Sequence, residues 1–352
     1  MMSVKTTIVR SGLETLYFSG AHVLMRPFVG GVGAVLMLHH VRPARRERFQ
    51  PNGQLEVTPD FLERVIRHLR RMDIDLISLD EMHRRMTERE FGRRFACFTF
   101  DDGYRDNKQW AYPILKAAQV PFAIYIATSF PDRLGKLWWL ALEAVVARND
   151  RIALMMDGEE RHIDCADLAT KRAVFEALYW WLRGLPTEDQ LLEVVRDLSA
   201  RYGVDTAALC AEQCMDWNEI AEIARDPLVT IGAHTVNHVM LAKASEGVVR
   251  SELKMSRAVL ETAIGAPPRH FAYPFGDHTT AGLREFRIAG ELGFKTAVTT
   301  RPGVLFAEHA DHLHALPRIS LNGAFQDTRF VSVLMSGAAT ALWNRFRRVD
   351  AA

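Results

Sequence analysis

The chain has 352 residues, 48% of them hydrophobic and 25% charged, which is the composition of a folded globular protein with one large α/β domain or two smaller ones. Its formal net charge of +1 creates no overall field that would attract nucleic acid. Four cysteines are too few for a disulfide framework, and they fit a protein of the reducing cytoplasm.

The N-terminal segment, residues 1–30, predicts an amphipathic helix that ends near Pro27. Apolar side chains recur at helical spacing between residues 4 and 27, with basic residues between them (Lys5, Arg10 and Arg26). Because polar residues interrupt the apolar run, which never reaches the roughly 20 apolar residues that span a bilayer, we expect neither a signal peptide nor a transmembrane helix. The helix is expected to pack on the domain, and a position in a membrane interface is the alternative.

Short apolar stretches then alternate with helix-like segments. Strands are predicted over residues 34–38, 74–79, 94–100, 120–127, 229–233, 269–276 (with a turn), 295–300 and 316–319. Helices are predicted between most of them, one beginning at Thr58 and Pro59 and others over residues 79–86, 106–118, 245–264 and 281–292. This alternation favours a parallel β/α architecture.

The rhythm changes between about residues 129 and 226, where the pattern is mostly helical apart from one hairpin pattern over Ile152–Ile163. We interpret this stretch as a helical insertion on a barrel. Its tryptophan pairs, Trp138–Trp139 and Trp180–Trp181, are expected to pack in a core. A platform that stacks on sugar rings is the alternative.

The C-terminal segment, residues 329–352, predicts a second amphipathic helix. Its apolar part begins at Phe330, and it ends in a basic cluster (Arg345, Arg347 and Arg348). The predicted organisation is therefore a terminal helix over residues 1–30, a barrel domain over residues 31–328 that carries the insertion, and a terminal helix over residues 329–352.

Two adjacent carboxylates, Asp101 and Asp102, close the apolar strand over residues 94–100, and Gly103 turns the chain away. The carboxyl ends of strands are where α/β folds bind ligands. Successive side chains at a strand end point in different directions, so one carboxylate can bind a metal while its neighbour acts as a base. A turn or a helix N-cap, which Asp and Gly also favour, is the alternative.

Two histidines, His234 and His238, follow another predicted strand at a spacing of four residues. If this segment coils into a helical turn, both imidazoles lie on one face and can bind the same cation. Together with one carboxylate they would make a three-ligand site that leaves positions open for water and substrate, as catalytic metal sites do.

These two motifs, residues 98–104 (FTFDDGY) and 234–238 (HTVNH), resemble the first two motifs of the polysaccharide deacetylases, carbohydrate esterase family 4. The resemblance extends over most of residues 31–325, with the helical insertion as the main exception. It implies an α/β fold, a distorted (β/α)7-type barrel, that removes N-acetyl groups from amino sugars. It also implies that Asp101 is the general base and that three side chains hold a divalent ion, usually zinc (Asp102, His234 and His238).

The third motif departs from the family pattern R-x-P-Y, because this chain has Ala272-Tyr273-Pro274-Phe275. The resemblance implies that the backbone N–H of Phe275 donates to the oxyanion, a role that does not depend on the side chain. Ala272 stands where the family has the arginine that orients the base. Arg269 and Arg318 are the two candidates to replace that arginine.

The acid that protonates the leaving amine also has two candidates. Residues 36–40 (LMLHH) resemble an early block of the poly-N-acetylglucosamine deacetylase branch, in which an early histidine supplies the acid. Many other relatives carry a late Leu-x-His motif, and the late segment of this chain offers His314. We expect His39 to be the acid, because it lies at a strand end.

The expected function is that of a metal-dependent hydrolase that removes N-acetyl groups from a poly- or oligosaccharide with amino sugars, or from a glycolipid. Its expected partner is an N-acetylated saccharide, with a lipid-linked one left open, and no nucleic acid. The alternatives are a deformylase or deacetylase of a lipid-linked sugar, a non-catalytic carbohydrate-binding relative, and a membrane-associated assembly factor. The cytoplasm is the expected location, with peripheral contact at the inner face of the membrane left open.

Overall fold

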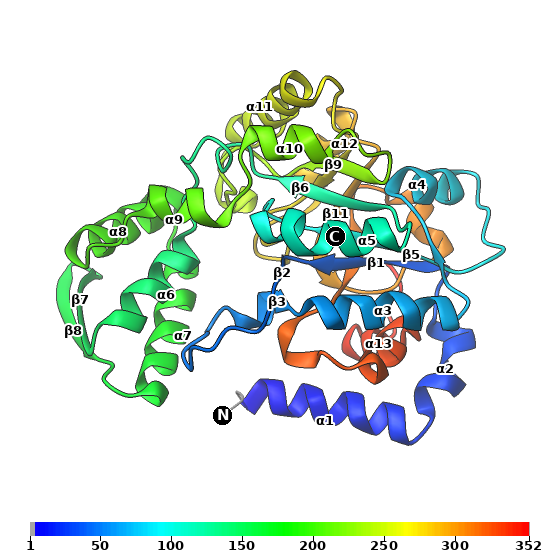
Figure 1. Cartoon of the computed structure of the whole chain (residues 1–352), viewed down its shortest axis with the longest axis horizontal. Coiled ribbons are helices and arrows are strands. Elements are labelled where there is room, and N and C mark those ends of the chain that lie inside the picture. The colour runs from blue at the N-terminus through cyan, green and yellow to red at the C-terminus, as the bar shows by residue number, and fades with distance from the viewer. Residues whose placement is uncertain (1–3, 352) are drawn as a thin grey trace.

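The computed structural model describes residues 4–351, and its central feature is a closed barrel of parallel strands (Figure 1). In order around the ring, the strands are β1 (Gly33–Leu38), β12 (Leu316–Ser320), β11 (Thr296–Pro302), β10 (His270–Ala272), β9 (Val229–Ala233), β6 (Phe122–Ile126) and β5 (Phe95–Phe100). Pairing of β1 with β5 closes the ring, with Ala34 opposite Ala96 and Leu38 opposite Phe100. The predicted (β/α)7-type barrel is confirmed.

The strands are apolar because both of their faces are buried, as parallel strands require. Every residue of β1 and of β5 is buried. Alternate residues face opposite sides: Val35 and Cys97 belong to one buried cluster, whereas Leu36 and Phe98 belong to another. Side chains along each strand therefore alternate between the barrel interior and the layer of surrounding helices.

Helices surround the barrel close to their predicted positions. They are α3 (Pro59–Arg71), α4 (Leu79–Thr87), α5 (Tyr112–Ala117), α10 (Trp217–Ile223), α11 (Glu246–Ile264) and α12 (Leu283–Glu291). The predicted start of α3 is confirmed, because the side chain of Thr58 accepts a hydrogen bond from the N–H of Phe61 and Pro59 is the first helical residue.

Two predicted segments differ in detail. The predicted strand over residues 74–79 is reduced to β4 (Asp75–Leu76), which pairs with the start of β5 and is not part of the ring. The predicted helix over residues 106–118 begins as a π-helical turn, Asn107–Ala111, before α5. Two short strands, β2 (His40–Val41) and β3 (Glu56–Val57), flank the loop between β1 and α3.

The helical insertion lies beside the barrel, at the end toward which β1 points (Figure 1). It consists of α6 (Trp138–Arg148), β7 (Arg151–Met156), β8 (Glu159–Asp164), α7 (Leu168–Gly184), α8 (Glu188–Arg201) and α9 (Thr206–Gln213). The predicted hairpin is confirmed as the antiparallel pair β7–β8. Trp138 and Trp139 pack in the core of the insertion, as predicted, whereas Trp180 is 55% exposed.

The N-terminal segment forms two helices, α1 (Val4–Phe18) and α2 (Ala21–Val29), instead of the single predicted helix. Gly20, with a φ of 73°, separates them in a left-handed conformation. Pro27 lies inside α2, so the predicted end of the helix was wrong by two residues.

The C-terminal segment is likewise divided, into α13 (Thr328–Met335) and α14 (Ala338–Trp343). Gly337 has a φ of 76° there, and a Cβ at this position would lie 1.9 Å from the carbonyl oxygen of Val29. Glycine therefore permits both the turn and the close approach to α2. No helix within residues 4–351 is long and apolar enough to cross a membrane.

Candidate active site

The motif residues meet at the carboxyl ends of the barrel strands. Asp101 and Asp102 follow β5, His39 follows β1, and His234 follows β9. Together with His238, they line a cavity of about 240 Å³. Parallel strands place their carboxyl ends at one rim of the barrel, so residues distant in the sequence converge there.

Three of these side chains form a cluster that can hold a metal ion. Nε2 of His238 lies 3.1 Å and Nε2 of His234 lies 3.4 Å from Oδ1 of Asp102. All three potential ligand atoms lie within 4.8 Å of one another, and all three residues are buried. Nδ1–H of His234 donates to the carbonyl oxygen of Ala272 at 2.7 Å, which leaves the Nε2 lone pair directed at the cluster.

The cluster also contains a buried oxygen atom that has no hydrogen-bond donor among the described residues and that a cation would coordinate. Oδ1 of Asp102 is buried and makes no hydrogen bond within residues 4–351. Burial alone would raise the pKa of Asp102, but the imidazoles of His238 and His234 hold it well below its ordinary value. For His238, burial outweighs the attraction of Asp102 and lowers its pKa, which favours the neutral imidazole that binds metals. The donor set therefore fits a divalent cation.

The helical turn that was considered as one way to bring the two histidines together does not form. Residues 234–238 form an irregular loop in which Thr235 and His238 have φ values of 66° and 56°. The hydroxyl oxygen of Thr235 accepts a hydrogen bond from the N–H of His238, and the carboxylate of Glu252 accepts from the N–H groups of Val236 and Asn237. This tight loop, rather than helical periodicity, directs both imidazoles at Asp102.

Positive φ values recur at other residues of the site. Asp102 has a φ of 72° and Phe275 a φ of 59°, in addition to the values of Thr235 and His238. Such conformations are costly for non-glycine residues, and they persist where the surrounding structure enforces them, often at functional sites. The backbone strain thus coincides with the residues that the motifs single out.

Asp101 is held by Arg318, one of the two candidates from the sequence. The guanidinium donates from Nη1 to Oδ1 at 2.8 Å and from Nη2 to Oδ2 at 2.7 Å, and its Nε–H donates to the carbonyl oxygen of Thr299 at 2.8 Å. The Arg318 side chain is fully buried. Burial would raise the pKa of Asp101, but the charge and hydrogen bonds of Arg318 lower it overall, so this carboxylate is ionised at neutral pH.

Arg269, the other candidate, lies elsewhere. It precedes β10, at the opposite end of the barrel from the cavity, and its guanidinium pairs with Asp80. Arg318 therefore reaches Asp101 from β12, whereas Ala272 on β10 stands where the family pattern has its arginine.

The two candidate acids are also separated by position. Nε2 of His39 lies 3.9 Å from Oδ2 of Asp101, and His39 lines the cavity. Burial lowers the pKa of His39 despite the nearby carboxylates. His314 precedes β12 at the opposite end of the barrel, where its Nε2 lies 2.7 Å from the carbonyl oxygen of Phe294.

Phe275 and His40 lie beside these groups. The N–H of Phe275 forms no hydrogen bond among the described residues, and its ring lies 4.9 Å from the ring of His238. His40 faces away from the cavity: its Nδ1 is 2.7 Å from Oδ2 of Asp106, and its ring stacks on Tyr104 at 3.6 Å. The structure therefore gives His40 a packing role.

Of the residues that form the outer wall of the cavity, the sequence singled out Trp139 alone, and only under the alternative of a platform that stacks on sugar rings. The insertion supplies Trp139, Tyr179 and Arg183, and the loop before β3 supplies Asn52 and Gln54. Nη2 of Arg183 lies 2.6 Å from Asp277, and its guanidinium carbon lies 4.9 Å from the centre of the Phe275 ring. No local motif marks these residues, because the wall exists only when the insertion packs against the barrel.

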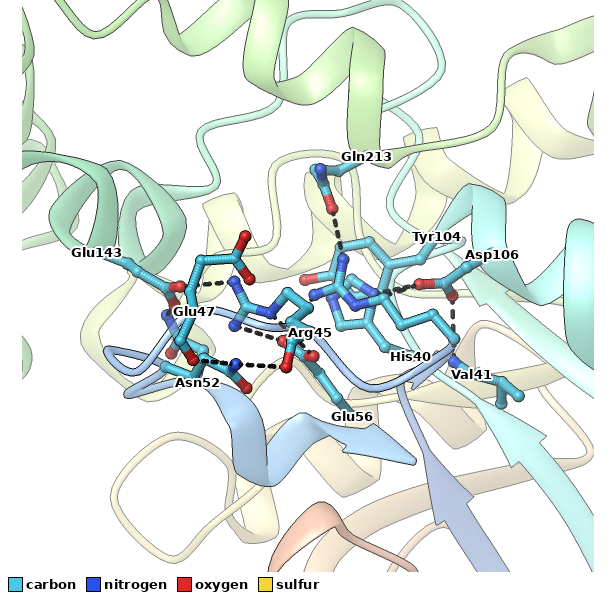
Figure 2. Close-up of polar contacts among 12 residues, drawn as sticks. His40, Val41, Arg45, Glu47, Asn52, Glu56, Tyr104, Asp106, Glu143 and Gln213 are labelled. Carbon is cyan, nitrogen blue, oxygen red and sulfur yellow. Dashed lines mark hydrogen bonds and ion pairs between the residues drawn. The ribbon is translucent and has the colours of Figure 1, made fainter. Parts of the chain in front are cut away.

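A polar network fastens the loop of residues 42–55, here called the clamp loop, to the insertion (Figure 2). Arg45 pairs with Glu56 at 2.7 Å and with Glu143 of α6 at 2.8 Å. Nδ2 of Asn52 donates to Glu143 at 2.8 Å and to the carbonyl oxygen of Trp139 at 3.0 Å. Because Asn52 and Trp139 both line the cavity, these contacts fix the wall.

Comparisons with known proteins agree with this geometry. A model of the polysaccharide deacetylase family matches residues 187–297, a segment that includes His234, His238 and Phe275 but not the paired aspartates. No curated protein matches the chain. The match covers less than half of the chain, and over that segment it agrees with the resemblance that the motifs predict.

Solved structures show the same fold. The deacetylase PplD of Streptococcus pyogenes, in complex with acetate, has 18% identity, covers 86% of this chain and 97% of its own, and gives a TM-score of 0.57. A de-N-acetylase of Aggregatibacter actinomycetemcomitans has 13% identity, covers 86% of this chain and 99% of its own, and gives a TM-score of 0.55. IcaB of Ammonifex degensii has 17% identity, covers 87% of this chain and 96% of its own, and gives a TM-score of 0.52. At these identities the likeness is one of fold.

Replacing Arg318 tests the buried ion pair. Arg318→Met leaves the Asp101 carboxylate buried without a partner, so we expect a loss of unfolding free energy of about 3–5 kcal/mol in urea, measured with chelator present. Arg269→Met is the matched control, because its pair with Asp80 is partly exposed and is expected to contribute about 0–1 kcal/mol. The double variant Asp101→Asn/Arg318→Met should recover much of the loss. Equal instability of the single and double variants would show that the ion pair is not the cause.

The clamp loop can be tested by removing its acceptor on α6. Glu143→Ala deprives Arg45 and Asn52 of their shared partner, so amide hydrogen exchange within residues 42–55 should become faster. Glu193→Ala on α8, where the side chain is 73% exposed, should leave the exchange of this loop unchanged. Unchanged exchange in Glu143→Ala would contradict a fastening role.

Proposed function

We propose that this protein is a polysaccharide deacetylase that hydrolyses the N-acetyl group of an amino sugar in a saccharide, with a divalent cation held by Asp102, His234 and His238. The observation that carries the proposal is the pairing of two different carboxylates in one buried cavity. One lies among imidazoles, and the other is held by Arg318. Binding alone would not need both a metal cluster and a separate base, which counts against a non-catalytic relative.

Zinc is the cation that we propose. Two imidazole nitrogens and one carboxylate oxygen are a common ligand set of catalytic zinc, with further positions left for water and substrate. When bound, the cation would supply Lewis-acid chemistry, polarising the amide carbonyl and lowering the pKa of a water molecule.

Asp101 is the proposed general base. Its carboxylate is ionised and lies beside the proposed metal ligands, while both of its oxygens accept hydrogen bonds from Arg318. Each carboxylate oxygen has a second lone pair, so one remains to take the proton of the attacking water. Arg318 fixes the direction of that lone pair, which makes it a positioning residue.

His39 and Phe275 complete the proposed reaction. Water oxygen bonds to the amide carbon, and the N–H of Phe275 donates to the oxyanion that forms. The C–N bond then breaks, and His39, on the rim next to Asp101, gives its proton to the leaving amine. The products are acetate and the free amino sugar.

The substrate is proposed from the wall of the cavity. Aromatic rings of Trp139, Tyr179 and Phe275 surround a volume of about 240 Å³, which suits one sugar ring with its acyl group.

A deformylase or deacetylase of a lipid-linked sugar uses the same groups and differs in the substrate that it accepts. Action in the cytoplasm is part of the same proposal. Acetate release from a panel of acetylated glycans and glycolipids, with and without chelator, tests the function.

The two neighbouring aspartates are expected to have separable roles. Asp102→Asn should lose both the bound cation and activity, because it removes a ligand. Asp101→Asn should retain the cation and lose turnover by roughly two to four orders of magnitude, the usual contribution of a general base. Metal content by plasma mass spectrometry and acetate release measure both quantities. Loss of the cation in Asp101→Asn would make Asp101 a ligand instead of a base.

The assignment of the acid is tested by a matched pair of histidines. His39→Ala should lower turnover by roughly two orders of magnitude or more. It should also change the alkaline limb of the pH–rate profile, because an acid must be protonated to act. His314→Ala should leave both nearly intact, since it lies at the other end of the barrel. The reverse pattern would move the acid to His314.

A further inference from the structure

The terminal helices carry an exposed apolar surface that the proposed chemistry does not use. Helix α2 has no buried residue although it is mostly apolar. Val23, Leu24 and Phe28 are 58%, 75% and 74% exposed. Leu24 and Phe28 are four residues apart, so they lie on one face of the helix. An apolar helix face of this kind is unusual on a protein that contacts water alone.

The end of the chain extends this surface. Leu342, Trp343 and Phe346 are all about half exposed or more, and α14 contacts α2. Phe28 and Phe346 line one groove of about 300 Å³ between these helices. We call the exposed large apolar residues of the N-terminal and C-terminal segments the terminal surface (Ile8, Phe18, Val23, Leu24, Phe28, Leu342, Trp343 and Phe346). It holds more than half of the large apolar side chains that are exposed within residues 4–351.

Cations without partners lie within the terminal surface. Arg26, Arg345 and Arg347 are exposed, and none forms an ion pair among the described residues. Two of the nearby acidic side chains already have partners: Glu308 pairs with Arg348 at 3.1 Å, and Asp327 pairs with Arg329. The terminal surface therefore combines apolar side chains with a positive charge.

We propose that the terminal surface binds an anionic phospholipid bilayer, with the exposed face of α2 and the end of α14 lying in the membrane interface. The apolar side chains would enter the acyl boundary, while the arginines contact anionic headgroups. An indole ring such as that of Trp343 is favoured at this level of a membrane. A second copy of the chain fits less well, because a symmetric contact would bring the same unpaired arginines together.

The other faces of the terminal helices make a rigid base for this contact. Leu13 of α1 packs with Phe330 and Val333 of α13. Helix α1 can therefore stay packed on the domain while the terminal surface contacts a membrane. Figure 1 shows α2 at the end of the barrel away from the helical insertion. Because the insertion forms a wall of the cavity, a bilayer at α2 would leave the candidate active site uncovered.

Vesicle flotation of the full chain tests the proposal. The protein should float with vesicles of equal parts phosphatidylcholine and phosphatidylglycerol, and much less with phosphatidylcholine alone or at high salt. Arg26→Gln, Arg345→Gln and Arg347→Gln should each weaken binding about fivefold. Leu24→Ser/Phe28→Ser should weaken it further. Arg148→Gln and Leu283→Ser, exposed positions outside the terminal surface, are matched controls expected to bind like the wild type.

A second readout guards against misfolded variants. Brominated lipid should quench the fluorescence of the wild type, and Trp343→Phe should remove most of that quenching while the remaining tryptophans report an intact fold. Three results would overturn the proposal: no flotation of wild type, flotation that ignores lipid charge, or a dimer that Leu24→Ser/Phe28→Ser dissolves in the absence of vesicle binding.

Discussion

Two neighbouring carboxylates buried in one cavity set the constraint on which this site depends. Asp101 and Asp102 are 2% and 3% exposed, and two anions so close together cannot both remain ionised without compensation. The fold compensates them separately. Arg318 from β12 pairs with Asp101, whereas the imidazoles of the loop after β9 surround Asp102. This division of charge gives each carboxylate a different electrostatic environment.

The closed barrel allows Asp101 and Asp102 to have separate charge partners. Because β12 and β9 lie on opposite sides of β5 around the ring, their side chains reach Asp101 and Asp102 from different directions. The clamp loop and the insertion then cover the rim, with Glu143 holding both Arg45 and Asn52. The cavity is therefore assembled from the barrel, one loop and one insertion that are far apart in the sequence.

Local patterns in the sequence were sufficient for the barrel and for most of the polar residues that line its rim. Alternating apolar stretches predicted the strands, and strand-end polarity singled out Asp101, Asp102 and His39. The choice of Arg318 over Arg269 required the three-dimensional register of β12, which no motif encodes. Most of the cavity wall could not be predicted for the same reason, and Trp139 was singled out only under the alternative of a sugar-stacking platform. The helical breaks at Gly20 and Gly337 were missed because apolar periodicity continues across them, although both residues have positive φ values that favour glycine.

The position of a bound cation tests the central claim most directly. Anomalous scattering at the zinc edge, from crystals grown with zinc, should give one strong peak about 2 Å from Oδ1 of Asp102 and from Nε2 of His234 and His238. The carboxylate of Asp101 should remain paired with Arg318 in the same crystals. A peak bonded to Asp101, or no peak at this cluster in zinc-replete crystals, would contradict the separate compensation of the two carboxylates.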